Sequence, residues 1–152
     1  MATDLALAIA HHLLVFGLAA VIAFEMAVIR VEVTGRDVAR IARVDMWYGI
    51  LAAAILIVGF LRVFYAAKGW AYYSHNLLFW AKIGTFAVIG LLSIPPTVAI
   101  FRWRRNSVTT EAFVVPLTEV QNVRRYLLAE AALFPLLLVF AAGMARGYGM
   151  LS

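Results

Sequence analysis

The sequence predicts an all-α membrane protein whose four transmembrane helices form an antiparallel, up-down-up-down bundle. Of its 152 residues, 65% are hydrophobic and only 14% are charged, whereas a soluble chain is about half apolar. A span needs roughly 20 mostly apolar residues to cross a hydrocarbon core of about 30 Å. Four stretches reach this length, at about residues 5–29, 46–66, 77–101 and 126–145.

These spans leave no room for a soluble unit, so residues 1–152 are expected to form a single transmembrane domain. Short connections make neighbouring helices antiparallel. We expect the first span to be retained, because it lacks a basic n-region and exceeds the roughly 7–15 apolar residues of a signal peptide. The chain has no cysteine, which excludes disulfides and thiolate metal sites.

The thirteen basic residues are distributed unevenly between the two sides of the predicted bundle. Two loops hold Arg30, Arg36, Arg40, Arg43, Arg102, Arg104, Arg105, Arg124 and Arg125. The remaining cations are Arg62, Lys68, Lys82 and Arg146. Because basic loops stay in the cytoplasm, both termini are expected on the outer side. Topology and contact with membrane lipids explain the net charge of +5, so no nucleic-acid partner is expected.

Residue spacing predicts which helix faces point inward. On the second helix a 3-4 spacing links Asp45, Tyr48, Ala52, Ile55, Gly59 and Arg62, and on the fourth it links Glu130, Phe134, Leu137, Ala141 and Met144. On the first helix His12 shares a face with the small residues Ala19 and Ala23, which favours close helix approach. His11 lies instead in line with Leu18 and Glu25. Pro95 and Pro96 are expected to bend or end the third helix.

Ionisable groups inside a bilayer are costly, and they therefore mark candidate functional positions. Glu25, Asp45 and Glu130 lie in the inner half, close to loop arginines. We expect these carboxylates to pair with arginines or with polar groups of facing helices, because an unpaired carboxylate there is expensive. A proton relay is the functional alternative for the same residues.

The outer half holds His11, His12, Arg62 and Lys82. Neutral imidazole is a good iron ligand, and a haem needs only one or two axial ligands from the protein. His12 is therefore the expected metal ligand, with Lys82 and Arg62 meeting the carboxylates of a tetrapyrrole. In the alternative, the histidine makes only a hydrogen bond to a neighbouring helix, and Lys82 extends to the interface.

Several stretches resemble a known family, namely HHLLVF, DMWYG, GFLRVFY, KGWAYY, FWAKIGTF, LLSIPPT and FRWRR. They are similar to a family of predicted bacterial membrane proteins, the domain of unknown function 2214. More distantly, the helix order resembles the HemJ-type protoporphyrinogen oxidases and the copper-resistance CopD-like membrane proteins. The likeness implies a bacterial inner membrane location and a haem b site that would involve His12 (or His11), Arg30 and Lys82.

Three functions are compatible with these sequence features. The first is binding of a haem-like tetrapyrrole in the outer half, with redox chemistry as the activity that such a cofactor supplies. The second is an accessory or structural subunit of a larger membrane complex or homo-oligomer. The third is a small transporter, which would need polar residues continuous from one side to the other. Whether the protein is an enzyme is left open by these residues.

Overall fold

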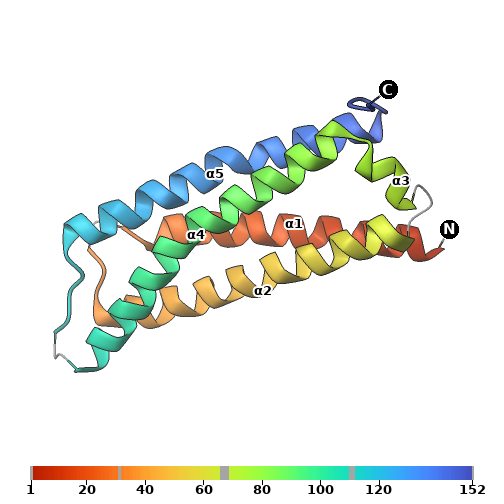
Figure 1. The fold of residues 1–152 in the computed structure, drawn as a ribbon. Helices are drawn as coiled ribbons and strands as arrows, with labels where there is room; N and C mark the ends of the chain where they lie inside the picture. The colour runs from red at the N-terminus through yellow and green to blue at the C-terminus, as the bar shows by residue number, and fades with distance from the viewer. Residues whose placement is uncertain (1, 31, 66–68, 110–111, 152) are drawn as a thin grey trace.

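The computed structural model describes residues 2–30, 32–65, 69–109 and 112–151. This part of the chain is helical, with α1 (Ala2–Val28), α2 (Gly35–Tyr65), α3 (Gly69–Ser74), α4 (Leu77–Thr109) and α5 (Leu117–Ala145) (Figure 1). Four of the helices, α1, α2, α4 and α5, are long and apolar enough to cross a membrane. The prediction of an all-helical protein with four spans is thus confirmed.

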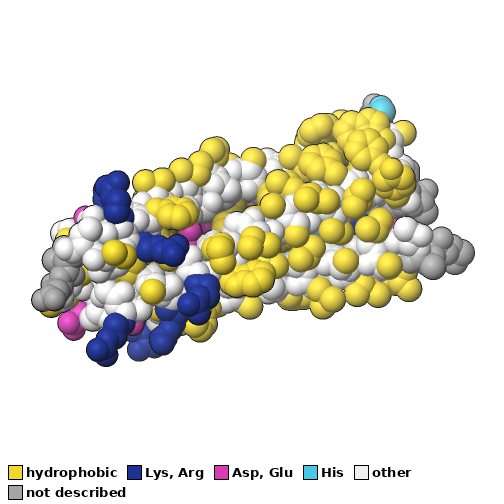
Figure 2. Space-filling view, turned by 90° about the horizontal axis from the view of Figure 1, so that it is seen from below, with side chains coloured by type: hydrophobic (Ala, Val, Ile, Leu, Met, Phe, Trp, Pro, Cys, Tyr) yellow, Lys and Arg dark blue, Asp and Glu magenta, His cyan; other side chains and the backbone are white. Residues whose placement is uncertain are grey.

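The bundle is built from two helix pairs. The most extensive contacts join α1 to α2 and α4 to α5, and the pairs meet through α2 with α4 and, less closely, α1 with α5. The two chain termini and α3 lie at one end, which we call the terminal end (Figure 1). The last residues of α1 and α4 and the first residues of α2 and α5 lie at the opposite end. Figure 2 shows lysine and arginine side chains gathered there, and we call it the basic end.

At the basic end the helices are longer than the hydropathy pattern predicted. Helix α2 begins at Gly35, α4 ends at Thr109 and α5 begins at Leu117. The start of α2 is capped, because the hydroxyl and the amide of Thr34 both donate to Asp37 Oδ2, at 2.7 Å and 3.0 Å. Hydropathy reports the width of the apolar core, whereas a helix continues into polar sequence for as long as its backbone groups are satisfied.

Helix α4 continues through Pro95 and Pro96 from Leu77 to Thr109, so of the two effects expected of the prolines, bending the helix or ending it, they do not end it. The half of α4 that follows them descends more steeply in Figure 1. Proline removes one backbone donor and crowds the preceding turn. Neighbouring helices can compensate for this inside a membrane bundle, so the pair bends the helix without stopping it.

Three buried apolar clusters follow one another along the bundle. The cluster at the basic end includes Trp103 and Val120, and the one at the terminal end includes Val63 and Phe79. The middle cluster contains Leu18, Ile22, Ile55, Ile89, Phe134 and Leu137, with Tyr48 as its polar member. We call those six apolar residues the apolar layer. The buried polar residues lie on the two sides of this layer, with His11 and Asn76 toward the terminal end and Glu25, Asp45 and Glu130 toward the basic end.

The face predictions hold for two helices and fail for α1. The stripes from Asp45 on α2 and from Glu130 on α5 are directed inward, and their larger apolar and aromatic members are buried. On α1, His12 is exposed while His11, Leu18 and Glu25 are buried. The predicted face of α1 is therefore wrong. Alanine is as compatible with lipid as with a helix interface, so small residues alone do not mark the inner side.

The C-terminal segment is fastened to the start of α4 by Asn76, which is fully buried. Its Oδ1 accepts hydrogen bonds from the amides of Leu78 (2.9 Å) and Phe79 (3.3 Å). Its Nδ2 donates to the carbonyl of Tyr148 at 3.0 Å, and the Leu77 amide donates to the carbonyl of Gly149 at 2.7 Å. We call residues 147–151 and Asn76 the C-terminal clasp. It holds α4 and the end of α5 together beside α3.

Replacing Asn76 by alanine is expected to lower the free energy of unfolding by about 2–3 kcal/mol, because a helix cap and a buried amide partner are lost together. Thermal unfolding in detergent measures the change. Asn122→Ala, at an exposed position on α5, is the matched control and should unfold like the wild type. Equal melting temperatures for both variants would contradict a structural role for the clasp.

Candidate functional site

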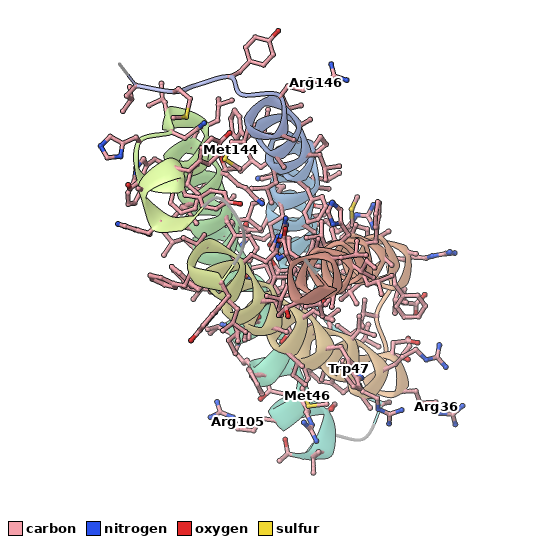
Figure 3. All side chains as sticks on the ribbon, turned by 90° about the vertical axis from the view of Figure 1, so that its right-hand side faces the viewer. Arg36, Met46, Trp47, Arg105, Met144 and Arg146 are labelled. Atoms are coloured by element: carbon pink, nitrogen blue, oxygen red, sulfur yellow. The ribbon has the colours of Figure 1, made fainter. Side chains whose placement is uncertain are left out.

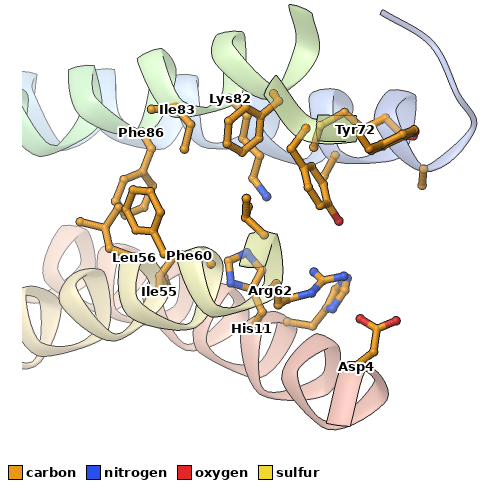
Figure 4. A pocket seen from close by; sticks show the side chains of 18 residues that line it. Asp4, His11, Ile55, Leu56, Phe60, Arg62, Tyr72, Lys82, Ile83 and Phe86 are labelled. Atoms are coloured by element: carbon orange, nitrogen blue, oxygen red, sulfur yellow. The ribbon is translucent and has the colours of Figure 1, made fainter. Parts of the chain in front are cut away.

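The terminal end contains a cavity of about 430 Å³ between the two helix pairs. The α1–α2 pair and the α4–α5 pair diverge toward this end, and α3 bridges them (Figure 1). All five helices contribute to the lining, as Figure 4 shows from close by. A volume of this size falls within the range of small-molecule sites, roughly 300–1,000 Å³.

Three nitrogen-bearing side chains from different helices meet in this cavity. His11 of α1, Arg62 of α2 and Lys82 of α4 all line it, and in Figure 4 the Lys82 amino group points across the cavity toward the His11 ring. The Nδ1 of His11 and the Nε of Arg62 are buried without a hydrogen-bond partner. Since buried polar atoms normally have partners, these two nitrogens indicate a place where a bound molecule would complete the structure.

The ring of His11 lies against Gly59 of α2. A Cβ atom at this glycine would be 3.4 Å from Cε1 of His11, which is at the close limit of ordinary van der Waals contact. The glycine therefore leaves the space that the imidazole occupies between α1 and α2. Sequence spacing placed Gly59 on the inner face of α2, but its role in seating a histidine becomes visible only in three dimensions.

The rest of the lining is mainly apolar and aromatic. The described apolar and aromatic lining residues are Ile55, Leu56, Phe60, Val63, Tyr72, Tyr73, Phe79, Ile83, Phe86, Ala141, Met144 and Ala145. Tyr72 donates a hydrogen bond of 3.0 Å to the carbonyl of Met144, which fixes α3 across the opening. Asp4 is the acidic residue of the described lining. An apolar wall with a few convergent cations suits a molecule that is largely apolar and carries negative groups.

Four of the five sequence-predicted site residues line this cavity, namely His11, His12, Arg62 and Lys82. Arg30 does not, because it follows α1 at the basic end, where it is exposed and donates to the carbonyl of Ala27 at 2.7 Å. The structure therefore does not bring Arg30 together with the other four residues. Arg146 is also exposed and points away from the bundle in Figure 3, whereas Met144 points between the helices.

His11, and not His12, is the histidine that faces the bundle. His11 is 7% exposed, while His12 is exposed and its Nδ1 lies 2.6 Å from the carbonyl oxygen of Ala8 on its own helix. Adjacent helical residues point about 100° apart, so only one of the two can face inward squarely. The seven-residue spacing of His11, Leu18 and Glu25 was the signal for the correct face, since it aligns two ionisable groups, which favour the interior of a membrane bundle.

A second polar group lies beyond the apolar layer, toward the basic end. Glu25 of α1 is 2% exposed, Asp45 of α2 is 8% exposed and Glu130 of α5 is fully buried. The three carboxyl groups lie within electrostatic range of one another. Thr97 of α4 donates a hydrogen bond of 2.7 Å to Oδ1 of Asp45. We call Glu25, Asp45 and Glu130 the acid cluster.

Two kinds of partner were predicted for this cluster, arginines or polar groups of facing helices, and among the described residues Asp45 has the second kind, in Thr97, while no arginine forms a salt bridge with the cluster. The salt bridge found among the described residues lies elsewhere, between Nη2 of Arg102 and Oε2 of Glu119, which are 2.8 Å apart. Arg124 instead donates from Nη1 to the carbonyls of Met26 (3.2 Å) and Ile29. The last carbonyls of a helix have no partner within the helix, and cations near this end are favourable. Arg124 therefore caps α1 and leaves the carboxyl groups of the cluster without a basic partner.

These features define an integral membrane protein with four spanning helices and a cation-bearing cavity at one end. The sequence profile of the family described as predicted membrane protein (DUF2214) matches residues 3–149. The chain belongs to this family. No curated protein and no solved structure matches it, so its function has to be argued from the site itself.

Proposed function

We propose that the protein binds a haem-like tetrapyrrole, haem b, in the cavity at its terminal end. The observation that carries the proposal is the convergence of His11, Arg62 and Lys82, from three helices, on one apolar cavity. His11 would be the metal ligand, in place of the predicted His12. Arg62 and Lys82 would meet the carboxylates, because cations at the membrane edge orient a ring whose body lies among apolar side chains.

The chemistry of the lining fits this group. The Nδ1 of His11 is buried without a hydrogen-bond partner, so this ring nitrogen is free to act as the metal ligand. Met144 lines the same cavity and supplies a thioether, the second ligand type used with histidine in haem proteins. When bound, haem supplies one-electron redox chemistry. The protein's own residues would bind and orient the ring and keep lipid and water away from it.

An absorption spectrum of the protein, purified after haem supplementation, tests the proposal. The wild type should show a Soret band, His11→Ala should lose it, and His12→Ala should keep it because His12 bonds its own helix. His75→Ala is a second control, since this residue lies outside the cavity lining. A wild-type protein that stays colourless with added haem would overturn the haem assignment.

We further propose that the terminal end faces the outside of a bacterial inner membrane and the basic end faces the cytoplasm, because arginine-rich segments remain on the cytoplasmic side. The chain has no cysteine, so single-cysteine variants report topology without background. With an impermeant maleimide on spheroplasts, Tyr148→Cys should be labelled directly, and Val108→Cys only after permeabilisation. Both positions are exposed. Direct labelling of both, or the reverse pattern, would contradict this orientation.

A further inference from the structure

We propose that the acid cluster is a proton-holding site, in which Glu25 and Glu130 are neutral carboxylic acids and Asp45 carries the negative charge. The inference is independent of the ligand proposed for the cavity, since the two sites lie on opposite sides of the apolar layer. It also differs from the structural pairing expected from sequence. The ligand of this site is the proton itself, exchanged by the dissociation of a carboxylic acid into a carboxylate and a proton.

The first support is that, within the described part of the chain, three oxygens of the two glutamates lack a donor in ordinary hydrogen-bond geometry. Both carboxyl oxygens of Glu130 and Oε1 of Glu25 are buried without a hydrogen-bond partner. A buried carboxylate without a partner is so costly that it takes up a proton instead. Three charges in one buried cluster would add mutual repulsion, which is strong where little water is present. The neutral acid removes both costs.

The surroundings of the cluster supply few compensating groups. On α2 the Tyr48 hydroxyl lies near both Glu130 and Ser93 of α4, but it makes no hydrogen bond of ordinary geometry to either oxygen of Glu130. On α5, Arg124 is engaged with the carbonyls at the end of α1. Apolar clusters close the bundle on both sides of the acids. No described basic side chain forms a salt bridge with the cluster.

The remaining contact assigns the negative charge to Asp45. Thr97 donates to its Oδ1 at 2.7 Å, and a hydroxyl donor favours the charged form of a carboxyl group. Glu25 and Glu130 accept no comparable bond at the oxygens named above. The described residues also hold no group of acidic or histidine side chains arranged for a metal ion. Geometry therefore favours protons over a bound metal as the means of neutralisation.

Infrared spectroscopy of the intact protein in lipid tests the assignment without any substitution. At neutral pH the spectrum should contain the carbonyl stretch of protonated carboxylic acids. This band should move when the protein is made with isotope-labelled glutamate and stay in place with labelled aspartate. Absence of the band at neutral pH would overturn the proposal, and so would a band that moves with labelled aspartate instead.

Substitutions then locate the protons. Glu25→Gln and Glu130→Gln keep the shape of a neutral acid, and each is expected to remove about half of the band, because two glutamates carry the protons. Glu119→Gln on α5 is the matched control, since Glu119 accepts hydrogen bonds from Arg102 and Trp103 and is ionised. It should leave the band unchanged. A band that survives undiminished in both cluster variants, or that disappears in the control, would overturn the proposal.

Discussion

Iron-free protoporphyrin is expected to bind about 100-fold or more weakly once Arg62 and Lys82 are both replaced by glutamine. Each cation that meets a carboxylate contributes about 1.5–3 kcal/mol, and every 1.4 kcal/mol corresponds to about tenfold in affinity. His11→Ala should leave the affinity for this metal-free ring unchanged, because the histidine contributes only through the metal. The comparison therefore separates recognition of the carboxylates from ligation of iron.

Porphyrin fluorescence, titrated against protein in nanodiscs, measures this affinity. Arg146→Gln is the matched control, since Arg146 lies at the same end of the bundle but is exposed and directed away from the cavity. It should bind like the wild type. If the control weakens binding as much as the double variant does, general surface charge and not the cavity recruits the ring. The assignment of Arg62 and Lys82 would then be wrong.

Gly149→Ala is expected to lower the free energy of unfolding by about 3 kcal/mol, whereas Gly147→Ala should cost only about 1–2 kcal/mol. Both glycines have φ of +83°, so both variants bear the strain of a left-handed residue. A Cβ at Gly149 would also lie 2.7 Å from Cγ of Leu78 and 3.0 Å from Oδ1 of Asn76, while a Cβ at Gly147 meets nothing within 4 Å. The difference between the variants isolates the close contact inside the C-terminal clasp.

Thermal unfolding of the two variants in the same detergent, followed by circular dichroism, gives this difference. Because the clasp lies beside α3, which covers one end of the cavity, Gly149→Ala should also increase protease cleavage near residues 146–151. Gly147→Ala should leave cleavage close to the wild-type pattern. If the two variants unfold together, backbone strain alone accounts for both, and the close approach to Leu78 has no energetic importance.

The four spans and two of the inner faces could be predicted from sequence because each depends on a strong local signal. Long apolar runs identify the spans. On α2 and α5, acidic residues head stripes of buried side chains, and a carboxyl group inside a membrane has to face the bundle. The same principle predicted that Arg62 and Lys82 lie at one depth in the bundle, and both line the same cavity.

Three features were predicted wrongly or missed: the partner of Arg124, the inner face of α1 and the clasp at Asn76. Arg124 was expected beside the carboxylates, yet it caps the carbonyls at the end of α1, and sequence alone does not show which partner is nearer. On α1, His12 with the small residues indicated one face, and His11 with Glu25 indicated another. That helix is apolar on all of its faces, so the spacing of its apolar residues does not indicate which face points inward. The clasp at Asn76 joins residues 72 positions apart and leaves no local signal.

The apolar layer also decides how the cavity exchanges its contents. Its buried members fill the space between Tyr48, at the level of the acid cluster, and Arg62, at the level of the cavity. These two residues are separated by roughly 20 Å along α2, given a rise of 1.5 Å per residue. A molecule admitted at the terminal end meets a layer of packed apolar side chains between the cavity and the acid cluster. A cavity closed on this side fits the proposed binding of a ligand at one end of the bundle.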